Sequence, residues 1–92
     1  MRGPRSQFAE NFPGGVKSEM PILILQGADD QVVPRWETDI LFDRLCVAGS
    51  QTEYRVLEGL DHVTSFTATI GDQLEWTNDR FAGEPASDTC PE

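Results

Sequence analysis

One histidine and two neighbouring aspartates are the residues best suited to carry out chemistry. His62 is the only histidine among the 92 residues, and Asp29 and Asp30 precede it in the chain. A carboxylate bonded to an imidazole fixes the tautomer of the ring and stabilises its protonated form, while the ring moves a proton to or from a reacting group. Either residue type alone is more often an inert surface group or a turn former. The interpretation therefore depends on whether the fold brings them together.

Two predicted strands position these side chains. Residues 21–25 are a continuous apolar run next to Pro and Gly signals, which is typical of a strand covered on both faces. Residues 52–57 alternate between charged and apolar side chains and predict a second strand. The aspartates lie in the loop over 26–34 and His62 ends the loop over 59–62, so each loop leaves the carboxyl end of a strand. Ligands of open parallel sheets bind outside those ends, so we expect the acid and the base at one edge of the sheet.

Helices are predicted over 35–47, where Pro34 suits the start and Gly49 the stop, and over 71–82. A further helical turn is predicted over 6–11. Phe66 is a candidate for the edge of a pocket. Apolar side chains at helical spacing are expected to face inward, and the aromatic ones among them to pack in the core; these residues are Trp36, Ile40, Leu41, Phe42, Leu45, Leu74, Trp76 and Phe81.

The order strand, helix, strand, helix fits a right-handed parallel crossover and predicts the α/β class. Two strands and two helices are too few to cover residues 21–25 from both sides. We therefore expect the C-terminal portion of a larger parallel sheet, that is, an incomplete domain. The predicted organisation is an irregular or linker segment over 1–20, followed by the α/β part over 21–92.

Composition limits the classes of partner. The chain holds 16 acidic and 7 basic residues, for a net charge of -9, which argues against nucleic acid and anionic membranes. No apolar run approaches the ~20 residues of a membrane span, so no stable membrane insertion is expected. Neither a metal-ligand spacing nor a Gly-rich phosphate loop occurs, so we expect no metal and no cofactor. Cys46 and Cys90 permit a single internal disulfide, although spacing alone does not decide whether it forms.

Several motifs resemble a known family. Gly27, Asp30 and the run Val32-Val33-Pro34 after an apolar strand are similar to the acid strand of α/β-hydrolases. More narrowly, residues 8–90 resemble the secretory lipase family, which contains the Candida-type lipases. The shared features are Ala9-Glu10-Asn11, Pro13-Gly14, Cys46 with Gly49, Gly59 with His62, Trp76, the run from Asp79 to Gly83, Pro85-Ala86 and Cys90.

This resemblance implies roles for particular residues. Asp30 would be the triad acid and His62 the general base; Asp29 is the competing acid, but Asp30 keeps the family spacing from Gly27. Asp61 is interpreted as solvated. The resemblance also implies a disulfide between Cys46 and Cys90, and with it an oxidising, extracellular location. Any export signal would lie outside this chain, because its first residues do not lead into an apolar stretch.

The nucleophile of such a site is missing from the sequence. None of the serines has the Gly-x-Ser-x-Gly framing of a nucleophile elbow. We therefore expect the C-terminal fragment of a lipase- or carboxylesterase-like serine hydrolase that cleaves triacylglycerol-type or smaller esters and is inactive without its N-terminal part. Two alternatives stay open: a free-standing acidic binding or structural domain, and a fragment of an α/β-hydrolase peptidase. The cysteine pair and the tail over 79–83 favour the lipase over the peptidase.

Overall fold

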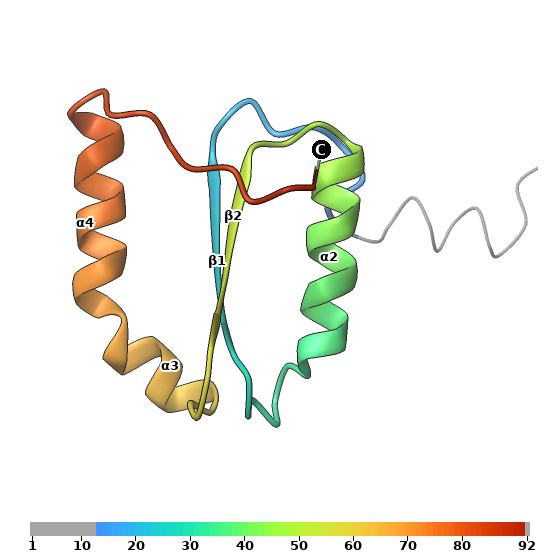
Figure 1. Ribbon diagram of the computed structural model, residues 1–92, viewed down its shortest axis with the longest axis vertical. Helices are drawn as coiled ribbons and strands as arrows, with labels where there is room; N and C mark the ends of the chain where they lie inside the picture. Colours follow the sequence, from blue (N-terminus) through green and yellow to red (C-terminus); the bar gives the residue numbers. More distant parts are fainter. Residues whose placement is uncertain (1–12, 92) are drawn as a thin grey trace, which may run out of the picture.

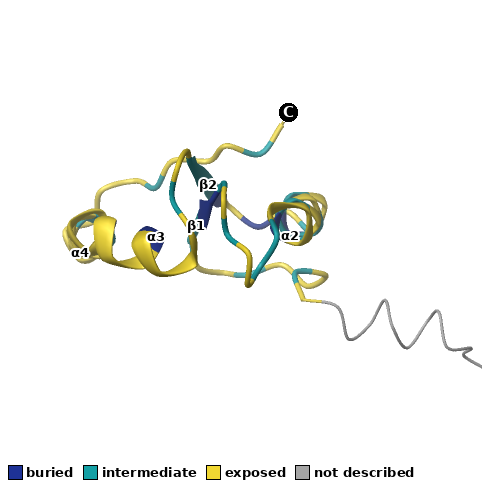
Figure 2. Ribbon diagram, turned by 90° about the horizontal axis from the view of Figure 1, so that it is seen from below, coloured by how far each residue is buried: buried dark blue, intermediate teal, exposed yellow. Residues whose placement is uncertain are grey.

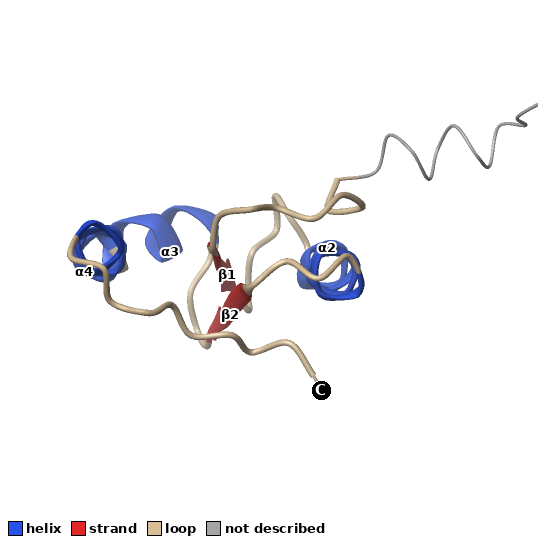
Figure 3. Ribbon diagram, turned by 90° about the horizontal axis from the view of Figure 1, so that it is seen from above, coloured by secondary structure: helices blue, strands red, loops and turns tan. Residues whose placement is uncertain are grey.

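The computed structural model describes residues 13–91, and it has the α/β architecture that the sequence predicts. Two parallel strands form the sheet, with helices on both of its faces (Figure 1). Helix α2 covers one face, whereas α3 and α4 lie on the other (Figure 3). The helical turn predicted over 6–11 lies outside the described residues. In chain order the elements are β1 (Ile22–Gly27), α2 (Arg35–Val47), β2 (Thr52–Leu57), α3 (His62–Ala68) and α4 (Ile70–Phe81).

The unit β1–α2–β2 forms where local sequence signals favour it. The strands pair in register from Ile22 opposite Thr52 to Gly27 opposite Leu57. Helix α2 begins after Pro34, whose φ of -63° and ψ of 143° set the entry to the first turn. It ends before Gly49, which adopts a φ of 87° that other residues rarely reach. The predicted boundaries of α2 and β2 are confirmed.

The C-terminal helical region differs from the prediction. The segment after β2, expected to stay a loop as far as His62, instead starts a helix at that residue, and a second helix begins at Ile70 and not at Gly71. Helix α3 forms because Asp61 caps it: the Asp61 carboxylate accepts a hydrogen bond from the Thr64 amide, and the Thr64 hydroxyl accepts one from the Asp61 amide. This reciprocal pairing satisfies two donors at the start of the helix.

The hydrophobic core of the described residues is small. Leu45 of α2 is their only buried apolar side chain. Most of the ribbon is exposed or half-buried (Figure 2). Phe42 packs on Tyr54 with ring centroids 5.0 Å apart, in agreement with its predicted core role. The inward orientation predicted for other side chains is wrong, because nothing among the described residues covers their faces of α2 and α4; the exposed ones are Trp36, Ile40, Leu74 and Phe81.

The C-terminal tail crosses the sheet from α4 toward α2 (Figure 1) and contacts the outer edge of β2 at Thr52 and Tyr54. The Thr89 amide donates to the Thr52 carbonyl at 2.9 Å, and the Tyr54 amide donates to the Thr89 hydroxyl at 2.9 Å. A disulfide between Cys46 and Cys90 joins the tail to the end of α2, with the two Cα atoms 5.5 Å apart. The tail thus satisfies strand-edge groups that would otherwise face solvent.

Replacing both Cys46 and Cys90 by serine is expected to lower the free energy of unfolding by about 4 kcal/mol, because the disulfide closes a loop with a sequence separation of 44. Urea denaturation of a complete hydrolase domain that contains this segment, with and without dithiothreitol, measures the effect. The reductant should destabilise the unmodified chain and leave the double variant unchanged. Equal urea midpoints for the oxidised chain and the double variant would contradict the prediction.

Candidate active site

Asp30 and His62 meet beyond the carboxyl ends of the two strands. Asp30 follows β1, and His62 is the first residue of α3 just after β2. The imidazole Nδ1 lies 2.9 Å from the carboxylate Oδ2, so the juxtaposition predicted from the sequence is present. The Asp30 side chain is only 7% exposed, whereas that of His62 is 51% exposed. The acid is thus covered while the imidazole remains open to a reactant.

The loop after β1 holds the Asp30 carboxylate in place. Its Oδ1 accepts hydrogen bonds from the amides of Val32 and Val33, both at 2.8 Å, which leaves Oδ2 for His62. Burial by itself raises the pKa of Asp30, but the hydrogen bonds from Val33, His62 and Val32 outweigh it and hold that pKa below its ordinary value. Asp30 therefore stays ionised at neutral pH.

The ionised carboxylate also determines the tautomer of His62. A carboxylate only accepts hydrogen bonds, so Nδ1 of the imidazole must carry the proton that joins them. In the neutral ring Nε2 then has a free lone pair. The pair has the polarity of an orienting acid and a general base.

The two neighbouring aspartates differ from Asp30. The Asp29 side chain is exposed, and no hydrogen bond joins it to His62 in the structure. Asp61, interpreted from the sequence as solvated, is exposed but also caps α3, and the amide and then the hydroxyl of Thr64 lower the pKa of its carboxyl. The cap fixes the first turn of the helix that carries His62.

Gly27 allows the start of α3 to approach the end of β1. A Cβ at this position would lie 2.5 Å from the Leu60 carbonyl oxygen and 2.9 Å from that of Asp61, and it would also collide with the Ser65 hydroxyl. Two of these groups belong to backbone that cannot move without displacing His62. The glycine is therefore needed for the close approach that places the imidazole beside Asp30.

A Gly27→Ala substitution is expected to destabilise the fold by about 1–3 kcal/mol, the usual cost of overpacking. It should also lengthen the bond between His62 and Asp30. Gly71→Ala is the matched control, because nothing lies within 4 Å of a Cβ there and alanine favours the helix. Thermal unfolding of a complete hydrolase domain that contains this segment compares the two variants. Equal stability of the Gly27→Ala and Gly71→Ala proteins would contradict the close approach.

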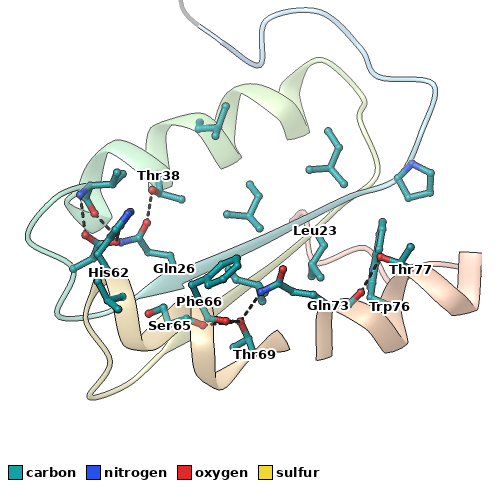
Figure 4. Close-up of a pocket in the computed structure, with 18 residues that line it drawn as sticks. Leu23, Gln26, Thr38, His62, Ser65, Phe66, Thr69, Gln73, Trp76 and Thr77 are labelled. Atoms are coloured by element: carbon teal, nitrogen blue, oxygen red, sulfur yellow. Dashed lines mark hydrogen bonds and ion pairs between the residues drawn. The ribbon is translucent and has the colours of Figure 1, made fainter. Parts of the chain in front are cut away.

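A groove of about 930 Å³ leads away from the acid–base pair along β1 (Figure 4). Phe66, the predicted pocket-edge residue, is among the side chains that line it. Thr38 and Leu41 of α2 form one wall, and α3 with α4 forms the other. The residues lining the second wall are His62, Val63, Ser65, Phe66, Thr69, Gln73, Trp76 and Thr77.

Gln26 is a structural residue of this site that the sequence analysis did not single out. Its side chain accepts a hydrogen bond from the Thr38 hydroxyl at 2.6 Å and donates one to the Val33 carbonyl at 2.8 Å. It thereby ties β1 to α2 and to the loop that holds Asp30. The available signal was a polar residue at the end of an apolar strand, because a buried amide requires partners.

No serine in the described part of the chain makes a hydrogen bond to the His62 imidazole. Ser65 lines the groove, but its hydroxyl donates to the Asp61 carbonyl and makes no hydrogen bond to the imidazole. The described residues thus supply a carboxylate–imidazole pair but no serine hydrogen-bonded to the imidazole. The described helices are also too short or too polar to cross a membrane.

A carboxylate–imidazole pair at the carboxyl ends of parallel strands is an arrangement that hydrolases acting by acid–base-assisted nucleophilic attack use. Comparison with known proteins identifies the family. The secretory lipase profile matches residues 9–89, so this chain belongs to the secretory lipase family. The matches point at the family level to lipase- or esterase-like hydrolases. A secretory family and the disulfide also agree with the expected export.

A curated relative adds a chemical comparison. The chain is 36% identical over 76 residues to a poly(3-hydroxyoctanoate) depolymerase of Pseudomonas fluorescens. The match covers 83% of this chain but 26% of the depolymerase, so the chain spans about a quarter of the length of that relative. No solved structure matches the chain.

Proposed function

We propose that this chain supplies the acid and the general base of a serine-hydrolase centre that cleaves carboxylic esters. The observation that carries the proposal is the 2.9 Å bond between His62 Nδ1 and Asp30 Oδ2, with the other carboxylate oxygen held by two backbone amides. The nucleophilic serine and the oxyanion donors would come from another part of the hydrolase domain, N-terminal to this segment. On its own the chain would be inactive, since its sequence contains no Gly-x-Ser-x-Gly nucleophile elbow.

In the proposed mechanism, Nε2 of His62 removes the proton from the serine hydroxyl as its oxygen attacks the ester carbonyl. The new carbon–oxygen bond gives a tetrahedral intermediate, and Asp30 stabilises the imidazolium that has formed. The bond to the alcohol then breaks, and the imidazolium gives its proton to the departing alkoxide. Water, deprotonated by the same Nε2, releases the acid from the acyl-serine and restores the enzyme.

Two ester classes are candidate substrates. Membership of the secretory lipase family supports triacylglycerol-type esters or smaller carboxylic esters. The relative from Pseudomonas fluorescens is a poly(3-hydroxyoctanoate) depolymerase, which favours a polyester as the second candidate. The bond broken is a carboxylic ester in both cases, so the roles of Asp30 and His62 would be the same.

The test is a graft in which this chain replaces the segment that it matches in the Pseudomonas fluorescens depolymerase. We expect the purified graft to hydrolyse tributyrin emulsions and p-nitrophenyl octanoate, and we expect a serine-directed phosphonate to inactivate it. Dispersed poly(3-hydroxyoctanoate) distinguishes the polyester from the triacylglycerol. Peptide hydrolysis without ester hydrolysis would favour the peptidase alternative.

The same experiment separates the hydrolase from a free-standing domain. An inactive graft, together with a sharp two-state thermal transition of the 92-residue chain alone, would support an acidic binding or structural domain. We expect the opposite, because one buried apolar side chain among the described residues is too small a core for cooperative folding.

A further inference from the structure

The side chain of Gln26 is buried, and each of its polar atoms has a partner (Figure 4). Gln26 is 4% exposed and its neighbour Thr38 is 7% exposed. The amide Nε2 donates to the carbonyls of Val33 at 2.8 Å and Gly27 at 2.9 Å, and Oε1 accepts from the Thr38 hydroxyl at 2.6 Å. A buried amide is costly unless it is bonded in this way, so an apolar side chain would be the simpler choice for strand packing alone.

The chemistry of these partners allows one orientation of the Gln26 amide. Backbone carbonyls only accept hydrogen bonds, so the atom that faces Val33 and Gly27 must be the nitrogen. Both N–H groups of the amide are then used. Oε1 is left as an acceptor, and the Thr38 hydroxyl must donate to it. Thr38 therefore holds the amide with its nitrogen toward the loop that carries Asp30.

The two carbonyls that Gln26 binds belong to the residues at the start and the end of this loop. At the start, the Gly27 carbonyl also accepts a hydrogen bond from the Asp30 amide at 3.2 Å. At the end, the Val33 amide donates to Asp30 Oδ1 at 2.8 Å. A single side chain thus fixes both the residue that binds the backbone of Asp30 and a residue that binds its carboxylate.

We propose that Gln26, held by Thr38, is a positioning residue that keeps Asp30 Oδ2 directed at His62; the two side chains are here called the loop clamp. This inference rests on the proposed function. The polar atoms of the loop clamp are buried and already bonded, so it acts on the reaction through Asp30 and not through the substrate. Since a displacement of about 1 Å in a catalytic group lowers the rate about 100-fold, its loss should lower kcat and leave KM nearly unchanged.

Gln26→Met in the depolymerase graft removes the amide and keeps a side chain of similar length. We expect kcat on p-nitrophenyl octanoate to fall about 100-fold and KM to change less than threefold. Gln51→Met is the matched control, because Gln51 also donates to a backbone carbonyl, that of Ala86, but lies at the opposite end of the sheet from Asp30. We expect the control to keep kcat within threefold. A folded Gln26→Met graft that keeps kcat within threefold would overturn the proposal.

Variants of Thr38 decide the case if the Gln26→Met graft does not fold. Thr38→Val removes the hydroxyl and keeps the shape, whereas Thr38→Ser keeps the hydroxyl. Thr52→Val is the control, because Thr52 is also buried but its hydroxyl donates to the Ser50 carbonyl, far from Asp30. We expect kcat to fall at least tenfold in Thr38→Val and to stay within threefold in the other two variants. Equal kcat in Thr38→Val and Thr38→Ser, or an equal fall in Thr52→Val, would overturn the proposal.

The tautomer of His62 is a readout that a loss of stability alone would not change. NMR of the graft with isotope-labelled histidine detects it, and the His62 signal is assigned by its absence in His62→Ala. We expect the neutral ring to carry its proton on Nδ1 in the unmodified graft and to be a mixture of both tautomers in Gln26→Met and Thr38→Val. An unchanged tautomer in these variants would overturn the proposal. Hydrolysis that survives His62→Ala would contradict the proposed function, while the tautomer would still report whether the loop clamp positions Asp30.

Discussion

Replacing His62 by alanine in the depolymerase graft is expected to lower kcat for ester hydrolysis by about 10⁴-fold or more, because loss of the general base of a triad removes most of the catalysis. The imidazole is the only one in the chain, it is half exposed, and its Nδ1 is already occupied by Asp30. Initial rates on p-nitrophenyl octanoate measure the effect.

Thr67→Ala is the control for this variant. Thr67 lies on α3, and its hydroxyl bonds only to backbone carbonyls of the same helix, so its removal should change kcat less than threefold. Equal rates for His62→Ala and the unmodified graft would contradict the assignment of the base. A fall of kcat in both variants would indicate damage to α3 and not loss of a proton acceptor. The thermal unfolding midpoints of the variants distinguish these two cases.

An Asp30→Asn substitution is expected to lower kcat by about 10⁴-fold while leaving the shape of the site unchanged. An amide next to Nδ1 no longer requires that nitrogen to carry the proton, and it does not stabilise the imidazolium. Asp29→Asn is a matched control one residue away, because the exposed Asp29 side chain makes no hydrogen bond to His62. We expect the Asp29→Asn variant to keep kcat within about threefold of the unmodified graft. A larger loss of kcat in Asp29→Asn than in Asp30→Asn would assign the role of the acid to Asp29.

The lowered pKa of Asp30 also predicts how stability changes with acid. Because that pKa is lower in the folded chain than in the unfolded chain, the carboxylate stabilises the fold fully above the unfolded value, near 3.8. This stabilisation is lost as the pH falls from there through the lower folded value. The measurement is the free energy of unfolding of the graft and of its Asp30→Asn variant as a function of pH. The two free energies should differ above this pH window and become equal below it.

Local sequence signals predicted the parts of the fold that local interactions determine. The apolar run of β1, the alternation of β2, and Pro34 and Gly49 around α2 are short-range features, and the structure confirms all three elements. The meeting of Asp30 and His62 followed from topology, because parallel strands bring their carboxyl ends to the same edge. These inferences needed no knowledge of distant contacts.

Other features escaped the sequence for physical reasons. Helix α3 contains Val and Thr residues, which lose side-chain freedom in a helix, so its sequence predicts a helix only weakly. The pairing of Asp61 with Thr64 as a cap was the one local signal for this helix. The inward faces predicted for α2 and α4 assumed neighbours that the described residues do not provide. The position of the tail depends on bonds between Thr89 and Thr52, far apart in the chain. The division at residue 20 and the substrate class stay predictions.

The disulfide-fastened tail has a consequence for biosynthesis. Inside a reducing cytosol, Cys46 and Cys90 remain thiols, and the strap over Thr52 and Tyr54 is then held by a few hydrogen bonds alone. The outer edge of β2 would then be more accessible to strand pairing with other chains, and aggregation would compete with folding. In an oxidising compartment the disulfide holds the tail over this edge.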